Sequence, residues 1–253
     1  MKEQVEVLTK QVCTSVLKRI LESGYQNKLW MKKKLDPGRA EAGLVFYPAE
    51  NCQKEMLENL RNLFREEIPE QKNLPLSVER KNRVVLEFEI DKYRIPFFIE
   101  VESYKETVLH PVEENFEKMK YYRFPTEEYL AQGFYEILDK LELLNNLSWY
   151  KEIYDILKLE AVDGRRVWEC LGKRLETKKI PSFEKRLETI KSYENYGYMK
   201  KKWKNEKKRQ KGEFPEWNQV ISLLAAFIAP VFEAIVQDEI FFGDWMPQLG
   251  RYL

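Results

Sequence analysis

Two neighbouring stretches of this chain alternate apolar and polar residues with the period of a β-strand, and they constrain the fold more than any other feature. In Arg83–Ile90 every second residue is valine, leucine, phenylalanine or isoleucine. Residues 94–102 repeat the pattern with isoleucine, phenylalanine and valine. Because Asp91 and Lys92 provide a short turn between the two stretches, the pattern predicts an antiparallel hairpin with one apolar face.

The polar face of the second predicted strand carries two carboxylates, Glu100 and Glu102, because side chains two residues apart in a strand point the same way. Paired carboxylates suit a metal-dependent phosphoryl-transfer site, since Mg²⁺ prefers oxygen ligands beside the reacting phosphate. Glu87 or Glu89 on the neighbouring strand would supply a further ligand. The same pattern is typical of an antiparallel strand with one buried and one solvated face, so both interpretations stay open.

Composition limits the class of protein. The chain has 253 residues, of which 43% are hydrophobic and 34% charged, as in a folded protein rather than a disordered or membrane-embedded one. The net charge of +1 provides no global field for nucleic acid, so any basic patch must be local. We expect no membrane partner, because the longest uncharged run, residues 217–232, is too short to span a bilayer and contains Pro230. That run predicts a core helix.

Cysteine and histidine usage points to a cytoplasmic protein without a histidine-based metal centre. The three cysteines share no metal-ligand spacing, and His110 is the only histidine. This pattern excludes multi-histidine metal sites and fits reduced thiols. The N-terminus, MKEQVEVLTKQ, has charges where a signal peptide needs an apolar run, which favours the same compartment.

The fold class predicted from these patterns is α+β, with a small mixed-sheet domain over residues 1–125 and an all-helical domain over residues 126–253. In the first domain, helices are predicted over 5–20 and 51–64 and short strands at 29–31 and 43–47, besides the hairpin. From Thr126 onward apolar residues recur at helical spacing almost to the end, with Asp163 and Ser182 as expected N-caps. Residues 182–211 predict one long charged helix, and Pro215 is expected to start the last helix.

The order of motifs resembles the AbiEii/AbiGii-type nucleotidyltransferases, the toxin members of abortive-infection toxin–antitoxin systems. The resemblance extends over nearly the whole chain, although each motif is short. The matching motifs are Ser23-Gly24-Tyr25, Leu29-Trp-Met-Lys32, Arg39-Ala-Glu-Ala-Gly-Leu-Val-Phe46, Ile99-Glu100-Val101, Val108-Leu-His-Pro111, Phe124-Pro-Thr-Glu-Glu-Tyr-Leu-Ala131, Lys151-Glu-Ile-Tyr-Asp155-Ile, and a tail with Trp203, Phe214-Pro215, Phe227-Ile-Ala-Pro230 and Trp245-Met-Pro.

The resemblance implies a nucleotidyltransferase fold, but this chain departs from the family's catalytic motifs. Where the family has a glycine turn that closes on the triphosphate, this chain has Lys32-Lys33-Lys34. The family's paired metal-binding aspartates fall at Gly43 and Val45, which cannot ligate a cation. The lysine of the following helix falls near Gly133. The third carboxylate of the family is matched by Glu100.

A basic segment is the other candidate site. Residues 200–211 hold eight basic residues, one acidic residue and Trp203. Clustered lysines beside an aromatic side chain suit a phosphate backbone with a stacked base, and they also suit the solvated face of a helix whose tryptophan turns into the core. The candidate residues for binding nucleic acid or a partner are Lys200, Lys201, Lys204 and Lys208, with a second group at Lys32, Lys33, Lys34 and Arg39.

Three functional hypotheses follow. The leading one is a catalytically degenerate nucleotidyltransferase-like protein of a prokaryotic defence system that needs no cofactor and acts by binding RNA or an acidic protein partner. The second is an active enzyme that uses Mg²⁺ at Glu100 and Glu102 to move a nucleotide from a triphosphate to RNA or protein, with Asp155 as a further catalytic candidate. The third is a structural or regulatory subunit of a defence or mobile-element system.

Overall fold

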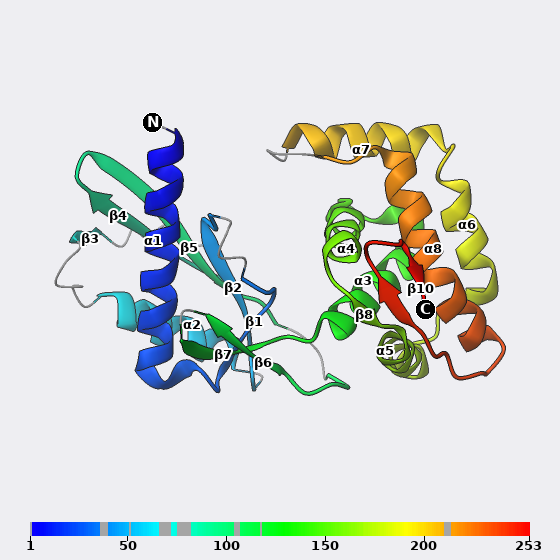
Figure 1. The fold of residues 1–253 in the computed structure, drawn as a ribbon, viewed down its shortest axis with the longest axis horizontal. Helices are drawn as coiled ribbons and strands as arrows, with labels where there is room; N and C mark the ends of the chain where they lie inside the picture. Colours follow the sequence, from blue (N-terminus) through cyan, green and yellow to red (C-terminus); the bar gives the residue numbers. More distant parts are fainter. Residues whose placement is uncertain are drawn as a thin grey trace. The chain divides into compact units, whose positions relative to one another are not determined.

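The computed structural model describes residues 2–35, 40–50, 52–65, 72–74, 82–103, 107–116, 118–209 and 214–253. The chain forms two compact units, each with its own hydrophobic core (Figure 1). Unit 1 comprises Met1–Glu106 and His110–Pro125, and unit 2 comprises Thr107–Leu109 and Thr126–Leu253. Unit 1 is a mixed sheet with helices and unit 2 is mainly helical, so the predicted α+β fold class is confirmed.

In the described part of unit 1 the strands form one seven-stranded sheet in the order β3-β4-β5-β2-β1-β7-β6. The β2–β5 and β1–β7 pairs are parallel and the other neighbours are antiparallel. The strands are β1 (Leu29–Met31), β2 (Gly43–Pro48), β3 (Lys72–Leu74), β4 (Arg83–Ile90), β5 (Tyr93–Val101), β6 (Val112–Phe116) and β7 (Met119–Arg123).

The predicted hairpin is the β4–β5 pair. Its register places Arg83 opposite Glu100 and Val84 opposite Ile99, and Asp91 adopts a positive φ of 53° in the turn. The alternate residues Ile95, Phe97, Ile99 and Val101 are buried, as the alternation predicts. Phe98 and Glu100 therefore lie on the opposite face of β5.

Two helices supply the other half of this core, α1 (Lys2–Ile20) and α2 (Gln53–Arg65). Apolar side chains of both helices are buried with those of β2, β4 and β5, so the helices cover the apolar face of the sheet. The chain leaves α1 through a π-helical turn, Leu21–Tyr25, in which Gly24 has a φ of 80°. A residue with a side chain is strained at such a φ, so Gly24 is the point at which the helical backbone is interrupted, within the Ser23-Gly24 pair predicted to end the helix.

The β6–β7 hairpin and β3 were not predicted from the sequence. Residues 112–116 read Val-Glu-Glu-Asn-Phe, so only the two ends are apolar and no alternation is visible. These strands form through backbone pairing instead, because β7 lies parallel to β1 with Trp30 opposite Tyr122. Tertiary context, rather than local propensity, decides such strands.

Unit 2 is built from six α-helices in its described part, with a small three-stranded sheet at its C-terminal end. Leu130, Phe134 and Phe227 are fully buried and Trp168 packs against them, as predicted. The elements are α3 (Thr126–Lys140), α4 (Ser148–Leu159), β8 (Val162–Asp163), α5 (Gly164–Thr177), α6 (Arg186–Ser192), α7 (Gly197–Arg209), α8 (Trp217–Val236), β9 (Asp244–Met246) and β10 (Arg251–Tyr252), with 3-10 turns at Leu141–Leu143 and Phe183–Lys185.

The central helix of unit 2 is α8, which packs as the predicted core helix. Its Phe227 ring stacks on Phe134 at 5.6 Å between centroids and contacts Trp245 edge-on at 5.2 Å. Among the described helices, α8 alone is long and apolar enough to cross a membrane, a property that the central helix of a folded core shares. Glu216 caps it in a capping box with Gln219, so the helix begins at Trp217, two residues after Pro215, which was expected to start it.

The prediction of one helix over residues 182–211 is wrong. The segment breaks into a 3-10 turn, α6 and α7, separated by a turn at Tyr193–Tyr196. Tyr193 is buried, and its carbonyl accepts a hydrogen bond from Trp217 Nε1 at 2.8 Å, so packing diverts the chain at that point. Ser182 also fails as an N-cap, because it has a φ of 51° and its side chain makes no capping bond, whereas Asp163 accepts from Arg166 N at 3.1 Å as predicted.

A buried carboxylate, Glu128 on α3, holds residues 107–109 to unit 2. Its Oε2 accepts hydrogen bonds from the backbone N–H of Val108 at 3.0 Å and of Leu109 at 3.3 Å. Arg174 donates to Oε1 at 2.8 Å and the Cys170 thiol to Oε2 at 3.2 Å. Burial, and then the charge of Glu128, raise the pKa of the Cys170 thiol, so it stays protonated as a donor.

We predict that Glu128→Gln lowers the stability of unit 2 by about 3 kcal/mol, because Arg174 then lacks its anionic partner and the amide NH2 group cannot replace the second acceptor oxygen. Tryptophan fluorescence during urea unfolding measures this, since five of the six tryptophans lie in unit 2. The matched control is the neighbouring Glu127→Gln, which should stay within about 0.5 kcal/mol of the wild type. Equal stabilities of the two variants would contradict the role given to Glu128.

Candidate functional site

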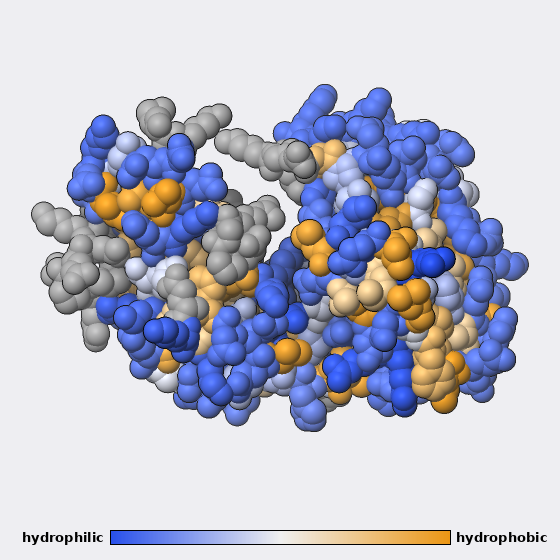
Figure 2. Space-filling model, viewed as in Figure 1, coloured by the Kyte–Doolittle hydropathy of each residue, from blue (hydrophilic) through white to orange (hydrophobic). Residues whose placement is uncertain are grey.

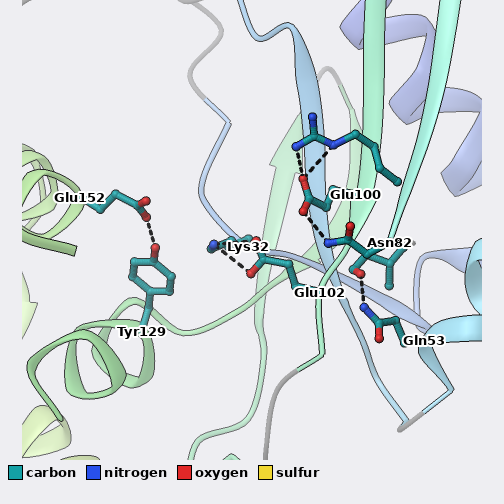
Figure 3. Close-up of polar contacts among 9 residues, drawn as sticks. Lys32, Gln53, Asn82, Glu100, Glu102, Tyr129 and Glu152 are labelled. Carbon is teal, nitrogen blue, oxygen red and sulfur yellow. Dashed lines mark hydrogen bonds and ion pairs between the residues drawn. The ribbon is translucent and has the colours of Figure 1, made fainter. Parts of the chain in front are cut away.

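The first predicted catalytic residue, Glu100, is engaged on both carboxylate oxygens. Arg83, its partner across the β4–β5 pair, donates from Nε to Oε2 at 3.0 Å and from its second guanidinium nitrogen to the same atom. Asn82 Nδ2 donates to Oε1 at 2.6 Å (Figure 3). A charge-assisted guanidinium pair of this kind neutralises the carboxylate and occupies its lone pairs.

Glu102, the second predicted catalytic residue, follows the last residue of β5. Its backbone N–H donates to Phe46 O at 2.9 Å, which extends the β2–β5 pairing by one residue. Lys32 Nζ lies 3.0 Å from each carboxylate oxygen, and both side chains are partly buried (Figure 3). Lys32 was predicted to belong to a basic binding group, whereas in the structure it forms an ion pair with Glu102.

Next to the Glu100 pair, on the side away from Glu102, the polar face of the sheet is filled by an aromatic ring. Phe98 on β5 lies over Gly43 on β2, its partner in the parallel register, so closely that a Cβ at position 43 would overlap the ring. The Arg83 guanidinium also stacks on the Phe98 ring, with its Cζ atom 4.2 Å from the ring centroid. An aspartate at position 43 would require this ring to move.

The glycine found in place of the family's lysine, Gly133, also has a packing reason. A Cβ at Gly133 on α3 would lie 2.6 Å from the Trp149 ring and 2.9 Å from the Ile153 side chain, both on α4. Trp149 in turn packs against Tyr129, with 5.0 Å between the two ring centroids. Any side chain at position 133, a lysine included, would push α4 away from α3.

The further carboxylates considered from the sequence do not complete a metal site. Glu87 and Glu89 lie opposite Pro96 and Arg94, so Glu87 is about 13 Å along the strand from Arg83 and Glu100. Both instead lie near Arg94 Nε, at 3.6 Å and 3.2 Å. Asp155, the third predicted catalytic residue, lies in unit 2 on α4 and pairs with Lys151 Nζ at 2.5–2.6 Å.

The residues present do not fit a two-metal site. Two cations need two or three converging carboxylates, but Gly43 and Val45 offer no ligand and Glu100 and Glu102 are each paired with a cationic side chain. Across the described residues, no three Asp, Glu, His or Cys side chains come together as a metal-binding group.

Part of the first predicted basic group, Lys32 to Lys34 with Arg39, is paired with acidic side chains of unit 1. Lys32 pairs with Glu102, and Lys34 Nζ lies 3.4 Å from Glu114. Lys33 is exposed. Arg39 lies outside the described residues.

The second predicted basic group, on α7, is different. Lys200, Lys204 and Lys208 recur every four residues and Lys201 lies beside them, so the four fall within an arc of about 100°. None of the four has an Asp or Glu partner within 4.0 Å in the described part of the chain, whereas Lys207 on the adjacent face lies 3.6 Å from Glu216. Figure 2 shows a mostly hydrophilic surface over α7. We call these four residues the α7 lysine face.

The opposite side of α7 is fixed in the core. Met199 and Trp203 are buried, with Trp203 only 3% exposed and its Nε1 donating to Pro215 O at 3.0 Å. Lys202 Nζ donates to the carbonyls of Glu142, at 3.0 Å, and Leu144. Trp203 therefore anchors the helix and is not available to stack on a base, which decides between the two interpretations of this tryptophan.

We call the face of β5 that carries Glu100 and Glu102 the carboxylate face. The sequence did not indicate that Arg83, Asn82 and Phe98 determine its contacts. The cross-strand register pairs Arg83 with Glu100, so extending the predicted hairpin by direct counting from the Asp91-Lys92 turn would have found this pair. No sequence signal indicates that Phe98 lies on Gly43, because that contact depends on the parallel β2–β5 register.

Comparison with known proteins gives a limited result. No protein-family model and no curated protein sequence matches this chain. Among solved structures, the chain is similar to JHP933 from Helicobacter pylori, with 7% identity, a TM-score of 0.49, and 90% of this chain and 94% of that chain covered. It is also similar to an antigenic nucleotidyltransferase-like protein from Paracoccidioides brasiliensis, with 12% identity, a TM-score of 0.41, and coverage of 72% and 92%.

We predict that Gly43→Ala destabilises unit 1 by about 1–3 kcal/mol, because the new methyl group overpacks against Phe98. In a Phe98→Ala background the same change should be nearly neutral, so the double variant should be less destabilised than the sum of the two single variants in a double-mutant cycle. Hydrogen exchange of β2 and β5 peptides measures the local free energy of opening. The control is Gly172→Ala, where a Cβ meets no atom within 4 Å and helix propensity should stabilise the protein slightly. Additive effects of the two unit 1 substitutions would refute the contact.

Proposed function

We propose that this chain is a nucleotidyltransferase-like protein that has lost the metal site of that fold and acts by binding nucleic acid through the α7 lysine face. The observation that carries the proposal is the set of four lysines without acidic partners among the described residues. Like charges within one or two turns repel one another and cost stability unless an anion relieves them. A phosphate backbone supplies such anions at regular spacing.

The nucleotidyltransferase part of the proposal is supported by where the family-like motifs lie. The motifs around Leu29-Trp-Met-Lys32, Gly43-Leu-Val-Phe46 and Ile99-Glu100-Val101 fall on β1, β2 and β5, which are consecutive neighbours in the sheet. This is the arrangement that strand-borne catalytic carboxylates require. The resemblance further suggests a cytoplasmic protein of a prokaryotic abortive-infection or toxin–antitoxin system, and we include that origin in the proposal.

The loss of catalysis is supported by the contacts of the carboxylate face. Glu100 is held by Arg83 and Asn82, Glu102 by Lys32, and Phe98 occupies the space over Gly43. Phosphoryl transfer depends on positioned metal ions to neutralise charge, and this face offers two carboxylates already neutralised by the chain itself.

We predict that Mg²⁺ with ATP, or with another nucleoside triphosphate, binds with a dissociation constant weaker than about 1 mM, which is less than about 4 kcal/mol of binding. Isothermal calorimetry of the full chain, with and without Mg²⁺, measures this. Tight binding that requires Mg²⁺ would instead favour the active-enzyme alternative, in which Glu100 and Glu102 exchange their cationic partners for metal ions.

We predict that replacing Lys200, Lys201, Lys204 and Lys208 by alanine flattens the salt dependence of single-stranded nucleic-acid binding by a log–log slope of about 3, because about four phosphate contacts are lost. Fluorescence anisotropy with a labelled oligonucleotide, titrated at several salt concentrations, measures the slope.

A matched control removes the same charge elsewhere on unit 2. Lys173, Lys178, Lys185 and Lys191 are exposed and lie on or beside α5 and α6. Their replacement by alanine changes the net charge equally but should leave the salt slope within about 1 of the wild type. If the two quadruple variants behave alike, or if the wild type binds no nucleic acid at low salt, the α7 lysine face is not a nucleic-acid site. An acidic protein partner then becomes the better explanation of the lysines.

A further inference from the structure

Two exposed tyrosines lie at the start of α7, immediately before the lysine face. Tyr196 is 44% exposed and Tyr198 is 51% exposed. Their ring centroids are 5.9 Å apart, and Tyr196 also stacks on the buried Tyr193, again with 5.9 Å between centroids and 28° between ring planes. Neither hydroxyl group has a hydrogen-bond partner among the described residues.

The position of these rings is set by the core. Tyr193 is buried, and its hydroxyl group donates to Glu142 Oε2 at 2.5 Å. That hydrogen bond is the main cause of a lowered pKa at Glu142, so the acceptor stays ionised. The turn at Tyr193–Tyr196 carries the chain from this anchor to the surface, and Tyr196 O accepts the Lys200 N–H at 3.1 Å as α7 begins. The two outer rings are thus held at a fixed place rather than on a loose loop.

The tyrosines and the lysines belong to one surface. Tyr196 and Lys200 are four residues apart and Tyr198 and Lys201 three apart, the spacings at which side chains on a helix surface are neighbours. The Tyr198 ring centroid also lies 5.7 Å from the ammonium of Lys202, a lysine of the core side that is already bonded to carbonyl groups. Large aromatic rings are normally buried in a core, and two of them exposed beside unpaired lysines indicate a partner that offers both phosphates and flat apolar faces.

We propose that Tyr196 and Tyr198 are stacking residues for the bases of single-stranded nucleic acid, whose phosphates are held by the α7 lysine face. This inference rests on the proposed function and narrows its ligand. Bases in a duplex are stacked on one another and present no free face, whereas bases of a single strand can stack on aromatic side chains. An acidic protein would satisfy the lysines but gives no reason for the exposed rings. RNA and DNA single strands share the required chemistry.

The test uses the full chain and three probes of roughly 12 units each, an oligo(U) RNA, an oligo(dT) DNA and a DNA duplex, within the usual site size of such surfaces. Tyr196→Ala with Tyr198→Ala should weaken single-strand binding at least about tenfold, since stacking of each base accounts for about fivefold or more. Duplex affinity and the salt slope should not change, because no phosphate contact is removed. The Tyr196→Phe/Tyr198→Phe variant should bind like the wild type, because phenylalanine keeps the ring. A tighter oligo(U) than oligo(dT) complex would identify RNA as the preferred source of the single strand, and the reverse order would identify DNA.

The outcomes separate this inference from the proposed function. A flattened salt slope in the lysine variant, together with unchanged single-strand affinity in the double alanine variant, overturns the stacking inference and leaves the lysine face in place. An equal loss of single-strand and duplex binding in the double alanine variant also overturns it, because stacking acts on free bases only. No binding by the wild type at low salt overturns both. A thermal melt confirms folding, since the substituted rings are half exposed and no large shift in Tm is expected.

Discussion

The contact on which unit 1 depends most is the one between the Phe98 ring and the backbone of Gly43. It requires β2 and β5 to run parallel in one register, it excludes any side chain at position 43, and it gives the Arg83 guanidinium an aromatic face to stack on. With Arg83 held there, Glu100 receives two guanidinium hydrogen bonds on its Oε2 atom. A strand face that could hold cations thus becomes a packed polar layer, in which each carboxylate is matched by a positive charge of the chain. Charged side chains are stable in a buried or half-buried place only when they are paired in this way.

The two candidate sites differ in how their charges are balanced. On β5 the chain supplies both members of every ion pair, so little net charge is left for a ligand. On α7 the core side of the helix is satisfied by Trp203 and Lys202, which donate to carbonyl oxygens, while the outer side keeps four positive charges without local anions among the described residues. In the described part of a chain with a net charge of +1, the α7 lysine face is thus a local concentration of positive charge without an overall field. Recognition at such a surface is short-ranged and depends strongly on ionic strength.

Sequence reasoning found the features that periodicity encodes. The β4–β5 hairpin, α1 and α2 follow from regular apolar spacing, the core helix α8 follows from a long uncharged run, and their boundaries were close. It missed what depends on distant contacts. The β6–β7 strands have no alternation of their own, and the break at Tyr193 is caused by burial of that ring and by its carbonyl bonding to Trp217. The same limit applied to the candidate sites. Glu100 and Glu102 were placed correctly on one face, but their pairing with Arg83 and Lys32 comes from the register of neighbouring strands, which the alternation of a single strand does not specify.

The path of the chain between the units has an evolutionary consequence. Residues 107–109 belong to unit 2, where backbone N–H groups of Val108 and Leu109 donate hydrogen bonds to Glu128, yet they precede the β6–β7 hairpin of unit 1. The segment that completes the helical unit is therefore encoded inside the gene region of the sheet unit. A single recombination event near codon 125 would join Glu128 to a foreign 107–109 segment, which would have to present its backbone N–H groups in the same conformation. Such an arrangement favours joint inheritance of the sheet and the helical unit.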